Sequence, residues 1–231
     1  MNIQGIEWDT YYTSLHEKGY AIIPGVLSKQ ECLQLTGHYD ENHLYRATIN
    51  MQRYRFGKGE YKYFNYPLPS LIHQLRDSLY GPLATLANEW MRQLSIEINF
   101  PVTNEELIRQ CAEKGQHRPT PLILRYEKGG FNTLHQDLYG EVYFPLQVVF
   151  VLSESGKDFE SGEFVLVEQL PRAQSRAEVV SPRQGDALIF TTNFRPVKGS
   201  RGYYRAKMKH GISPLTSGTR YALGIIFHDA A

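Results

Sequence analysis

The segment Leu124–Asp137, which reads LRYEKGGFNTLHQD, carries the pattern from which the fold can be reasoned. It opens as a strand, passes through the flexible pair Gly129-Gly130 and ends on His135-Gln136-Asp137. Side chains two residues apart in an extended segment point to the same face, so His135 and Asp137 can reach one common ion. The segment therefore predicts a β structure that presents one imidazole and one carboxylate together.

Around this segment the sequence forms short stretches rich in β-branched and aromatic residues. Glycine, proline, serine or aspartate separates one stretch from the next. Many short strands with turn signals between them indicate a closed or double-sheet β structure, of which the jelly roll is one solution. The expected strands are Pro121–Glu127, Val142–Leu152, Glu163–Glu168, Glu178–Val180, Ala187–Thr192 and Tyr221–His228.

Toward the N-terminus the sequence reads mainly as helix. Ser28 and Thr103 each begin a capping-box pattern, with glutamate three residues later. Leucines at four-residue spacing predict a helix that starts at Ser70 and stops at Gly81-Pro82, and a second helix follows over Leu83–Leu94.

Length and composition suit one domain. The chain has 231 residues, 42% of them hydrophobic, and no repeat, low-complexity segment or linker divides it. We therefore expect a single α+β domain over 1–231, with a mainly helical support at 1–118 packed on a β core at 119–231.

Charge and cysteine content restrict the possible partners. The net charge of +1 predicts no partner by itself. Cys32 and Cys111 are not part of a CxxC motif, so a disulfide framework or cysteine zinc site is not expected. The N-terminus lacks the pattern of a signal peptide, and the longest central apolar run, Val148–Leu152, is far too short to span a bilayer. We expect a cytoplasmic protein without a membrane partner.

Two residues further along the chain extend the first pair. His210 lies beyond several expected strands, where a β fold can return it to His135 and Asp137. Two histidines and one carboxylate on one side of a metal are typical of Fe(II) oxygenases. Arg220 opens a strongly apolar strand ten residues later, and such a cation needs an anionic partner. A zinc hydrolase is the competing metal-site interpretation, but the sequence has no HExxH motif.

The HxD…H…R pattern resembles the Fe(II)/2-oxoglutarate-dependent dioxygenases, which are built on the double-stranded β-helix, a jelly-roll variant. The resemblance implies that His135, Asp137 and His210 are iron ligands. It also implies that Arg220 pairs with the distal carboxylate of 2-oxoglutarate, with Tyr126 adding a hydrogen bond. The cofactors implied are Fe(II), 2-oxoglutarate and O2, and the reaction oxidises a C–H bond with release of succinate and CO2.

Within that superfamily, the quoted segment is similar to the AlkB-type nucleic-acid demethylases, which carry an arginine–tyrosine pair, a glycine turn and HQD at matching spacing. The chain departs from their pattern in three places. Leu124 replaces an asparagine, Ile226 stands where the second arginine would fall, and Leu138-Tyr139 replace the acidic residue expected after HQD. These departures concern the recognition of the base.

Two stretches combine cations with aromatic residues, a mixture that suits phosphate contact and base stacking. They are Arg53–Phe64 and Arg195–Lys209. Solvated strands and loops with the same composition are the alternative interpretation.

Three functions therefore stay open. The favoured one is oxidative demethylation of methylated or damaged nucleic acid. The second is hydroxylation of an amino acid, a prolyl peptide or a small metabolite, and the third is a metal-binding β-barrel without catalysis. The oligomeric state is open as well.

A few other residues could contact the substrate, and one further pair resembles metal ligands. Tyr139, Gln147 and Arg205 are expected substrate contacts, although Gln147 also fits a satisfied core position and Tyr139 fits surface packing. His228-Asp229 mimics a ligand pair, and we interpret it as a solvated chain end.

Overall fold

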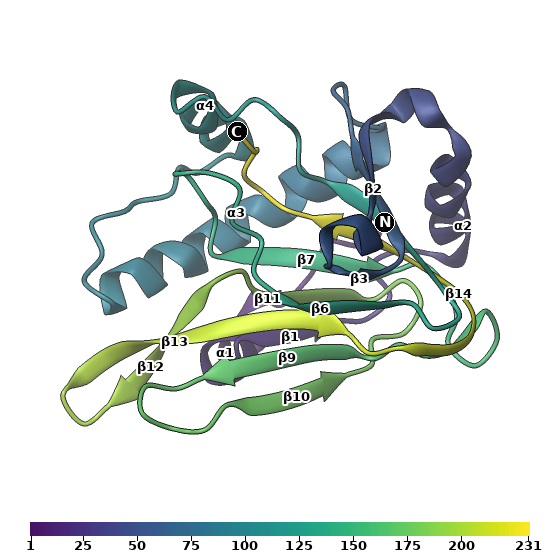
Figure 1. Ribbon diagram of the computed structural model, residues 1–231. Helices are drawn as coiled ribbons and strands as arrows, with labels where there is room; N and C mark the ends of the chain where they lie inside the picture. Colours follow the sequence, from purple (N-terminus) through teal and green to yellow (C-terminus); the bar gives the residue numbers. More distant parts are fainter.

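The computed structural model describes all residues, 1–231, and consists of two β-sheets with helices packed on one of them (Figure 1). The larger sheet has the strand order β1-β11-β7-β14-β5-β4-β2, with β8 paired to β14. Its strands are β1 (Tyr20–Ile23), β2 (Tyr45–Asn50), β4 (Glu60–Phe64), β5 (Leu122–Glu127), β7 (Leu146–Val151), β8 (Phe159–Ser161), β11 (Ala187–Thr191) and β14 (Leu215–Ile225).

The smaller sheet has the strand order β10-β9-β13-β6-β3, with β12 paired to β13. Its strands are β3 (Gly57–Lys58), β6 (Phe131–His135), β9 (Phe164–Gln169), β10 (Arg176–Val180), β12 (Phe194–Gly199) and β13 (Gly202–Ile212). Side chains of both sheets meet in one buried cluster, for example Val149 and Phe190 with Phe164 and Met208. The predicted double-stranded β-helix is confirmed.

Helices cover the outer face of the larger sheet (Figure 1). The longest helix, α3, packs Leu75, Leu79 and Leu83 into a core that includes Val148 and Phe150 of β7. None of the helices combines the length and the apolar character needed to cross a membrane. The helices are α1 (Trp8–Lys18), α2 (Lys29–Gly37), α3 (Ser70–Gln93) and α4 (Asn104–Glu113), with short 3₁₀ turns η1 (His38–Asp40), η2 (Asn42–Leu44) and η3 (Met51–Tyr54).

The predicted helix stop at Gly81-Pro82 is wrong, because α3 continues through both residues to Gln93. Proline at this point lacks the N–H that would bond back along the helix. Burial of the flanking leucines against the sheet outweighs that cost, since Leu79 and Leu83 are both completely buried. The capping box at Ser28 is confirmed, and the Thr103 side chain accepts a hydrogen bond from the Glu106 backbone.

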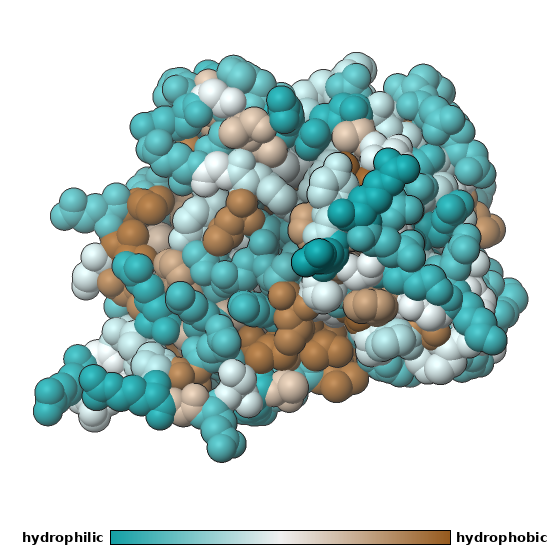
Figure 2. All heavy atoms as spheres, in the orientation of Figure 1, coloured by the Kyte–Doolittle hydropathy of each residue, from teal (hydrophilic) through white to brown (hydrophobic).

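The N-terminal part contains strands as well as helices. The strands β1, β2 and β4 belong to the larger sheet and β3 belongs to the smaller one. Among the expected strands, Val142–Leu152 begins only at Leu146. The expected strand Tyr221–His228 overlaps the second half of the longer β14, which ends at Ile225. The basic stretch Arg195–Lys209 forms most of the β12–β13 hairpin, which Figure 2 shows as hydrophilic next to a hydrophobic area over β9 and β10.

The interpretation of His228-Asp229 as a solvated chain end is wrong. His228 is 0% exposed and Asp229 is 1% exposed. The Asp229 carboxylate pairs with the Arg76 guanidinium of α3 at 2.8 Å, so a buried charge is matched by a buried countercharge. The His228 Nδ1 atom accepts a hydrogen bond from the Phe144 backbone at 3.1 Å. These contacts attach the end of the chain to α3 and to the loop that follows β6.

Candidate metal centre

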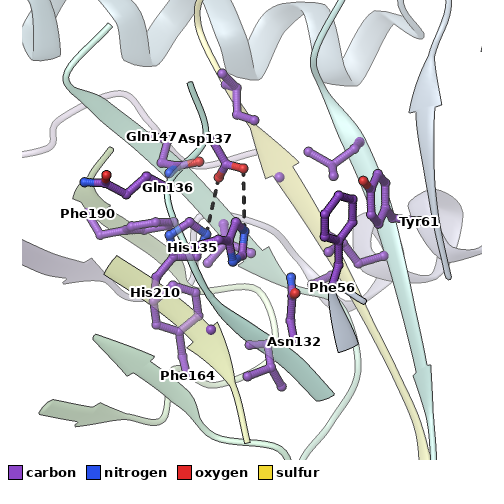
Figure 3. Close-up of a pocket in the computed structure, with 18 of the residues that line it drawn as sticks. Phe56, Tyr61, Asn132, His135, Gln136, Asp137, Gln147, Phe164, Phe190 and His210 are labelled. Carbon is purple, nitrogen blue, oxygen red and sulfur yellow. Dashed lines mark ion pairs between the residues drawn. The ribbon is translucent and has the colours of Figure 1, made fainter. Parts of the chain in front are cut away.

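His135, Asp137 and His210 lie together at one end of the space between the sheets (Figure 3). His135 ends β6, and His210 stands directly opposite it on β13 in the antiparallel register. Asp137 follows two residues after β6 and places its Oδ2 atom 3.3 Å from His210 Nε2 and its Oδ1 atom 3.6 Å from His135 Nε2. One donor atom from each residue lies within 4.8 Å of the others.

The surroundings of the two imidazoles fix their orientation. The Thr133 carbonyl accepts a hydrogen bond from His135 Nδ1 at 2.7 Å, which leaves the lone pair on Nε2. The His210 ring stacks on Phe164 with 5.7 Å between centroids and an angle of 7°, and Phe190 covers it from another side at 4.7 Å. Both Nε2 atoms therefore face Asp137.

Gly211 allows the two histidine strands to approach. A Cβ atom at residue 211 would lie 2.6 Å from the Asn132 carbonyl oxygen and 3.3 Å from the Thr133 backbone. Contacts this short with backbone atoms are not tolerated, so a side chain at this position would separate β13 from β6. The close approach brings His210 within reach of His135.

Burial and charge favour the protonation states that bind a cation. Burial alone raises the pKa of Asp137, but the hydrogen bond and charge of His210, the charge of His135 and the Tyr139 hydroxyl outweigh it and lower the pKa. Burial, followed by the charge of His135, lowers the pKa of His210. At neutral pH the site thus offers an ionised carboxylate and a neutral imidazole, the forms that metals require.

Tyr139 holds the carboxylate of Asp137. Its hydroxyl donates a hydrogen bond to Asp137 Oδ1 at 2.6 Å. This contact occupies one oxygen and leaves Oδ2 facing His210. In the AlkB-type pattern an acidic residue is expected here, whereas in this chain a tyrosine orients the carboxylate.

A cavity of about 210 Å³ extends from the three side chains between the sheets. Arg220 and Tyr126 line it on neighbouring strands, directly opposite each other in the β14–β5 register. Arg220 is 2% exposed, and its guanidinium lies 5.9 Å from the Tyr126 ring centre and 5.8 Å from the Phe159 ring centre. It forms no ion pair with any carboxylate of the chain. Burial lowers the pKa of Arg220, but a guanidinium stays charged at neutral pH.

These residues fit Fe(II) together with a dicarboxylic acid. Two imidazoles and one carboxylate that converge and leave positions open match the donor set of non-haem Fe(II) oxygenases. A buried guanidinium without a protein partner, in the same cavity, matches a second carboxylate at some distance from the metal.

An aromatic rim borders the cavity where it opens. Tyr54 and Phe56 are 56% and 45% exposed, and their rings stack at 5.6 Å with an angle of 18°. Phe56 lines the cavity. Its carbonyl accepts hydrogen bonds from the backbone and side chain of Thr133, both at 2.9 Å, so the rim is attached to the strand of His135. Arg55, between the two aromatic residues, is exposed and has the left-handed φ of 61°.

Of the three expected substrate contacts, two lie in the cavity and one does not. Tyr139 and Gln147 both line the cavity. Arg205 does not: it lies on the β12–β13 hairpin opposite Pro196, with its guanidinium 5.0 Å from the Phe194 ring centre. Five residues of extended strand separate it from His210, a distance of roughly 16 Å.

Several cavity residues had no signal in the sequence. Phe164 and Phe190 looked like ordinary strand residues, and their contacts with His210 depend on strand register. Asn132 carries no motif of its own, although the Gly57–Asn132 pairing between β3 and β6 brings it to the cavity. Phe56 and Tyr61 belong to the aromatic–basic stretch noted in the sequence, but nothing there indicated that they border the metal centre.

Comparison with known families identifies the class of protein to which the chain belongs. Residues 59–230 match the family model described as "Oxygenase, catalysing oxidative methylation of damaged DNA". The chain belongs to this oxygenase family.

The chain is also similar in sequence to a mycobacterial relative and in fold to solved structures. The Mycobacterium tuberculosis protein called "Uncharacterized protein Rv2227" is 38% identical to this oxygenase over 228 residues, which cover 99% of this chain and 93% of that one. A Pseudomonas putida prolyl-4-hydroxylase has a similar fold, with a TM-score of 0.55, 15% identity, and coverage of 96% of this chain and 98% of that one. An oxidoreductase of the 2OG-Fe(II) oxygenase family from Burkholderia pseudomallei gives a TM-score of 0.57, 15% identity, and coverage of 98% and 94%.

The family match identifies the protein as an oxygenase, and the solved structures share its fold. The converging side chains of His135, Asp137 and His210, with Arg220 in the same cavity, fit Fe(II) and 2-oxoglutarate, the cofactors that the motif set implies. The third function considered from the sequence, a metal-binding barrel without catalysis, is wrong.

Proposed function

We propose that the oxygenase demethylates N-methylated bases in single-stranded nucleic acid. His135, Asp137 and His210 would hold the iron, and Arg220 with Tyr126 would hold the distal carboxylate of 2-oxoglutarate. The observation that carries the site assignment is Arg220: a buried guanidinium without a protein carboxylate, in the cavity that also contains the three metal donors. Because β1–β4 join both sheets, we also treat residues 1–231 as one oxygenase domain.

The side chains of the cavity position the reactants and exclude water. When bound, Fe(II) and 2-oxoglutarate supply oxidation of a substrate C–H bond together with release of succinate and CO2. Arg220 can bind a carboxylate with two parallel hydrogen bonds, which fixes the co-substrate's direction in the cavity. Phe164 and Phe190 shield His210 from solvent, and Tyr139 keeps Asp137 oriented. These contacts prearrange the reactants.

The rim at the cavity supports a nucleic-acid substrate. Tyr54 and Phe56 present exposed, stacked aromatic faces, and bases stack on such faces in single-strand binding proteins. Arg53 and Arg55 are exposed on either side of Tyr54, where they can contact phosphates. A base that leaves its stack could then enter the cavity lined by Phe56. Oxidation of an N-methyl carbon gives a hydroxymethyl group, which leaves the base as formaldehyde.

Hydroxylation of a prolyl peptide, an amino acid or a small metabolite is the alternative, suggested by the fold likeness to the Pseudomonas putida enzyme. The two reactions differ in their products. Demethylation releases formaldehyde in a one-to-one ratio with succinate, whereas hydroxylation leaves a stable hydroxylated product and no formaldehyde.

The proposal is tested by supplying the purified enzyme with Fe(II), 2-oxoglutarate and air. Single-stranded oligonucleotides with one methylated base are compared with prolyl peptides and free amino acids, and succinate and formaldehyde are both measured. We expect formaldehyde only from the methylated oligonucleotides, with binding that weakens as salt increases. His210→Ala should abolish both products. If only peptides or amino acids stimulate succinate formation, the nucleic-acid assignment is wrong while the oxygenase chemistry remains.

A further inference from the structure

Gln147 has a buried hydrogen-bond donor without a partner. The residue lies on β7, is 4% exposed and lines the cavity. Its Nε2 atom forms no hydrogen bond with any group of the protein. Buried amide groups in folded proteins are nearly always paired, so an exception that faces a cavity points to a ligand.

Strand register places Gln147 far from the co-substrate anchor. In the β14–β7 ladder, Ala222 stands opposite Val151 and Gly224 stands opposite Val149. Arg220 is two residues beyond Ala222 in one direction, and Gln147 is two residues beyond Val149 in the other. Six strand positions therefore separate Arg220 from Gln147, about 20 Å along the sheet at the usual rise.

The metal donors lie near the Gln147 end of the cavity. Gln147 lines the same cavity as Asp137, His135 and His210, and Figure 3 draws its amide on the Asp137 side of that cavity. On β11, Phe190 stands directly opposite Gln147 in the ladder and also packs on His210. Gln147 thus borders the metal centre on the side away from Arg220, which leaves the co-substrate's distal carboxylate out of its reach.

No other side chain at this level forms a hydrogen bond with the Nε2 donor of Gln147. Phe190 and Val149 are apolar, and so is Ile226, which lies one step beyond the Ile225–Val148 pair. The Asp137 carboxylate accepts from Tyr139, faces both histidines and forms no hydrogen bond with Gln147. Ile226 also stands where the AlkB-type pattern has its second arginine, so Gln147 supplies the polar group at this level from the adjacent strand.

We propose that Gln147 reads the substrate base by donating a hydrogen bond to a carbonyl oxygen next to the methylated ring nitrogen. This inference rests on the proposed function and narrows it to a class of bases. A base such as 3-methylthymine, with carbonyl groups on both sides of the N-methyl group, would pair with the Nε2 donor. In 1-methyladenine an amino group and a C–H flank the N-methyl group, so the base offers no carbonyl oxygen at either position.

Two substitutions at residue 147 distinguish the effect of the hydrogen-bond donor from the effect of the side chain's shape. Gln147→Met keeps a similar length and removes the donor and the acceptor. Gln147→Glu keeps the shape and offers acceptors only, which suits the amino group of 1-methyladenine. Val151→Ile, on the same strand, buried and outside the cavity lining, is the matched control for a packing change without a polar change.

The experiment compares binding and turnover of single-stranded oligonucleotides that carry either 3-methylthymine or 1-methyladenine. Dissociation constants are measured with nickel-loaded enzyme, and formaldehyde release is measured with iron-loaded enzyme. We expect the wild type and Val151→Ile to prefer 3-methylthymine at least tenfold. Gln147→Met should lose the preference and Gln147→Glu should reverse it. Binding of 2-oxoglutarate should stay within twofold of wild type in all variants.

The possible failures are distinguishable. If the wild type demethylates both oligonucleotides without preference, or if Gln147→Met and Gln147→Glu keep the wild-type preference, the inference is overturned and the proposed function stands. If the wild type neither binds nor demethylates any methylated oligonucleotide, the proposed function fails and the inference fails with it. Gln147→Glu decides the matter even if Gln147→Met does not fold, because it changes neither length nor branching.

Discussion

At the residue scale, the sequence indicated the metal donors because His135 and Asp137 are close together and the distant His210 completes the HxD…H…R pattern. The His135–Asp137 pair is weak evidence alone, and its combination with His210 and with Arg220, a cation in an apolar strand, made the prediction specific. Tyr139 and Gln147 were ambiguous, since a tyrosine or glutamine fits surface, core and pocket equally well. Arg205 was expected near substrate from its basic surroundings, but an extended hairpin carries it away from the cavity.

The Tyr139 hydroxyl should contribute to metal affinity. Tyr139→Phe removes the hydrogen bond to Asp137 Oδ1 and leaves the ring in place. Loss of a group that orients a metal ligand typically costs about 10–100-fold in affinity. We expect a change of that size in the dissociation constant for Mn(II) or Ni(II), measured by calorimetric titration. Tyr221→Phe, on the outer side of β14 against Tyr39, is the control and should bind metal normally. Equal affinities in the two variants would contradict the orienting role.

The Arg220 guanidinium should determine affinity for the co-substrate. Arg220→Lys keeps the charge and loses the planar pair of donors. Hydrogen bonds to charged groups contribute about 1.5–3 kcal/mol, which corresponds to roughly 10–100-fold in binding. We expect the dissociation constant for 2-oxoglutarate to rise by that factor in nickel-loaded enzyme, while metal affinity stays the same. Arg205→Lys, outside the cavity, should have no effect. Unchanged binding of 2-oxoglutarate in Arg220→Lys would show that its distal carboxylate binds elsewhere.

At the element scale, local rules predicted the strands but not where they pair. Ala187–Thr192 and Glu163–Glu168 were found within one residue, because runs of apolar and aromatic residues report burial directly. The β12–β13 hairpin was missed, because its many charged residues suppress the apolar signal. Helix α3 was divided wrongly because a proline rule is local, whereas the packing that overrides it comes from the sheet beneath.

Pro82 inside helix α3 should lower the free energy of unfolding by a measurable amount. Proline inside a helix is about 3 kcal/mol less favourable than alanine, and part of this cost is relieved by the surrounding fold. Pro82→Ala restores an N–H donor in a helix that already continues past this residue. We expect the free energy of unfolding to rise by about 1–3 kcal/mol in denaturant titrations. Pro69→Ala, at the N-cap of the same helix, should give no such gain. Destabilisation by Pro82→Ala would mean that packing of the proline ring stabilises the folded protein.

At the scale of the whole molecule, the sheets could be predicted from the sequence but the way the chain closes on itself could not. Arg76 and Asp229 are 153 residues apart and look like ordinary surface charges in the sequence. Their pairing depends on α3 crossing the last residues of the chain, which no local pattern encodes. The same long-range contacts support the loop between β6 and β7, because Phe144 bonds to His228 and the Tyr139 carbonyl accepts from the Ala231 backbone.

His228 should make the stability of the fold depend on pH. Burial, followed by the charge of Arg76, lowers the pKa of His228 to about 4 in the folded protein. Its ordinary pKa is about 6.5, so between these values the unfolded chain binds the extra proton. Neutral His228 therefore contributes fully to the free energy of unfolding above pH 6.5. As the pH falls toward 4 this contribution is lost, and the loss amounts to at most about 3 kcal/mol.

Denaturant unfolding at pH 7.0, 5.5 and 4.5 measures this dependence. His228→Asn keeps an acceptor for the Phe144 backbone and removes the titrating ring. We expect the variant to lose less stability than the wild type between pH 7.0 and 4.5, because the remaining carboxylates contribute equally to both. Parallel pH profiles would assign the acid sensitivity to other groups.

The narrow space beside Gly211 has a consequence for recognising distant relatives. Because backbone oxygens occupy the place of any side chain there, a chain could retain both histidines, the aspartate and the arginine and still be unable to gather them around one ion. A diagnostic signature for functional members should therefore read HxD, then HG, then R. Sequences that carry a bulkier residue after the second histidine should be sorted as degenerate paralogues, even when every metal-donating position is intact.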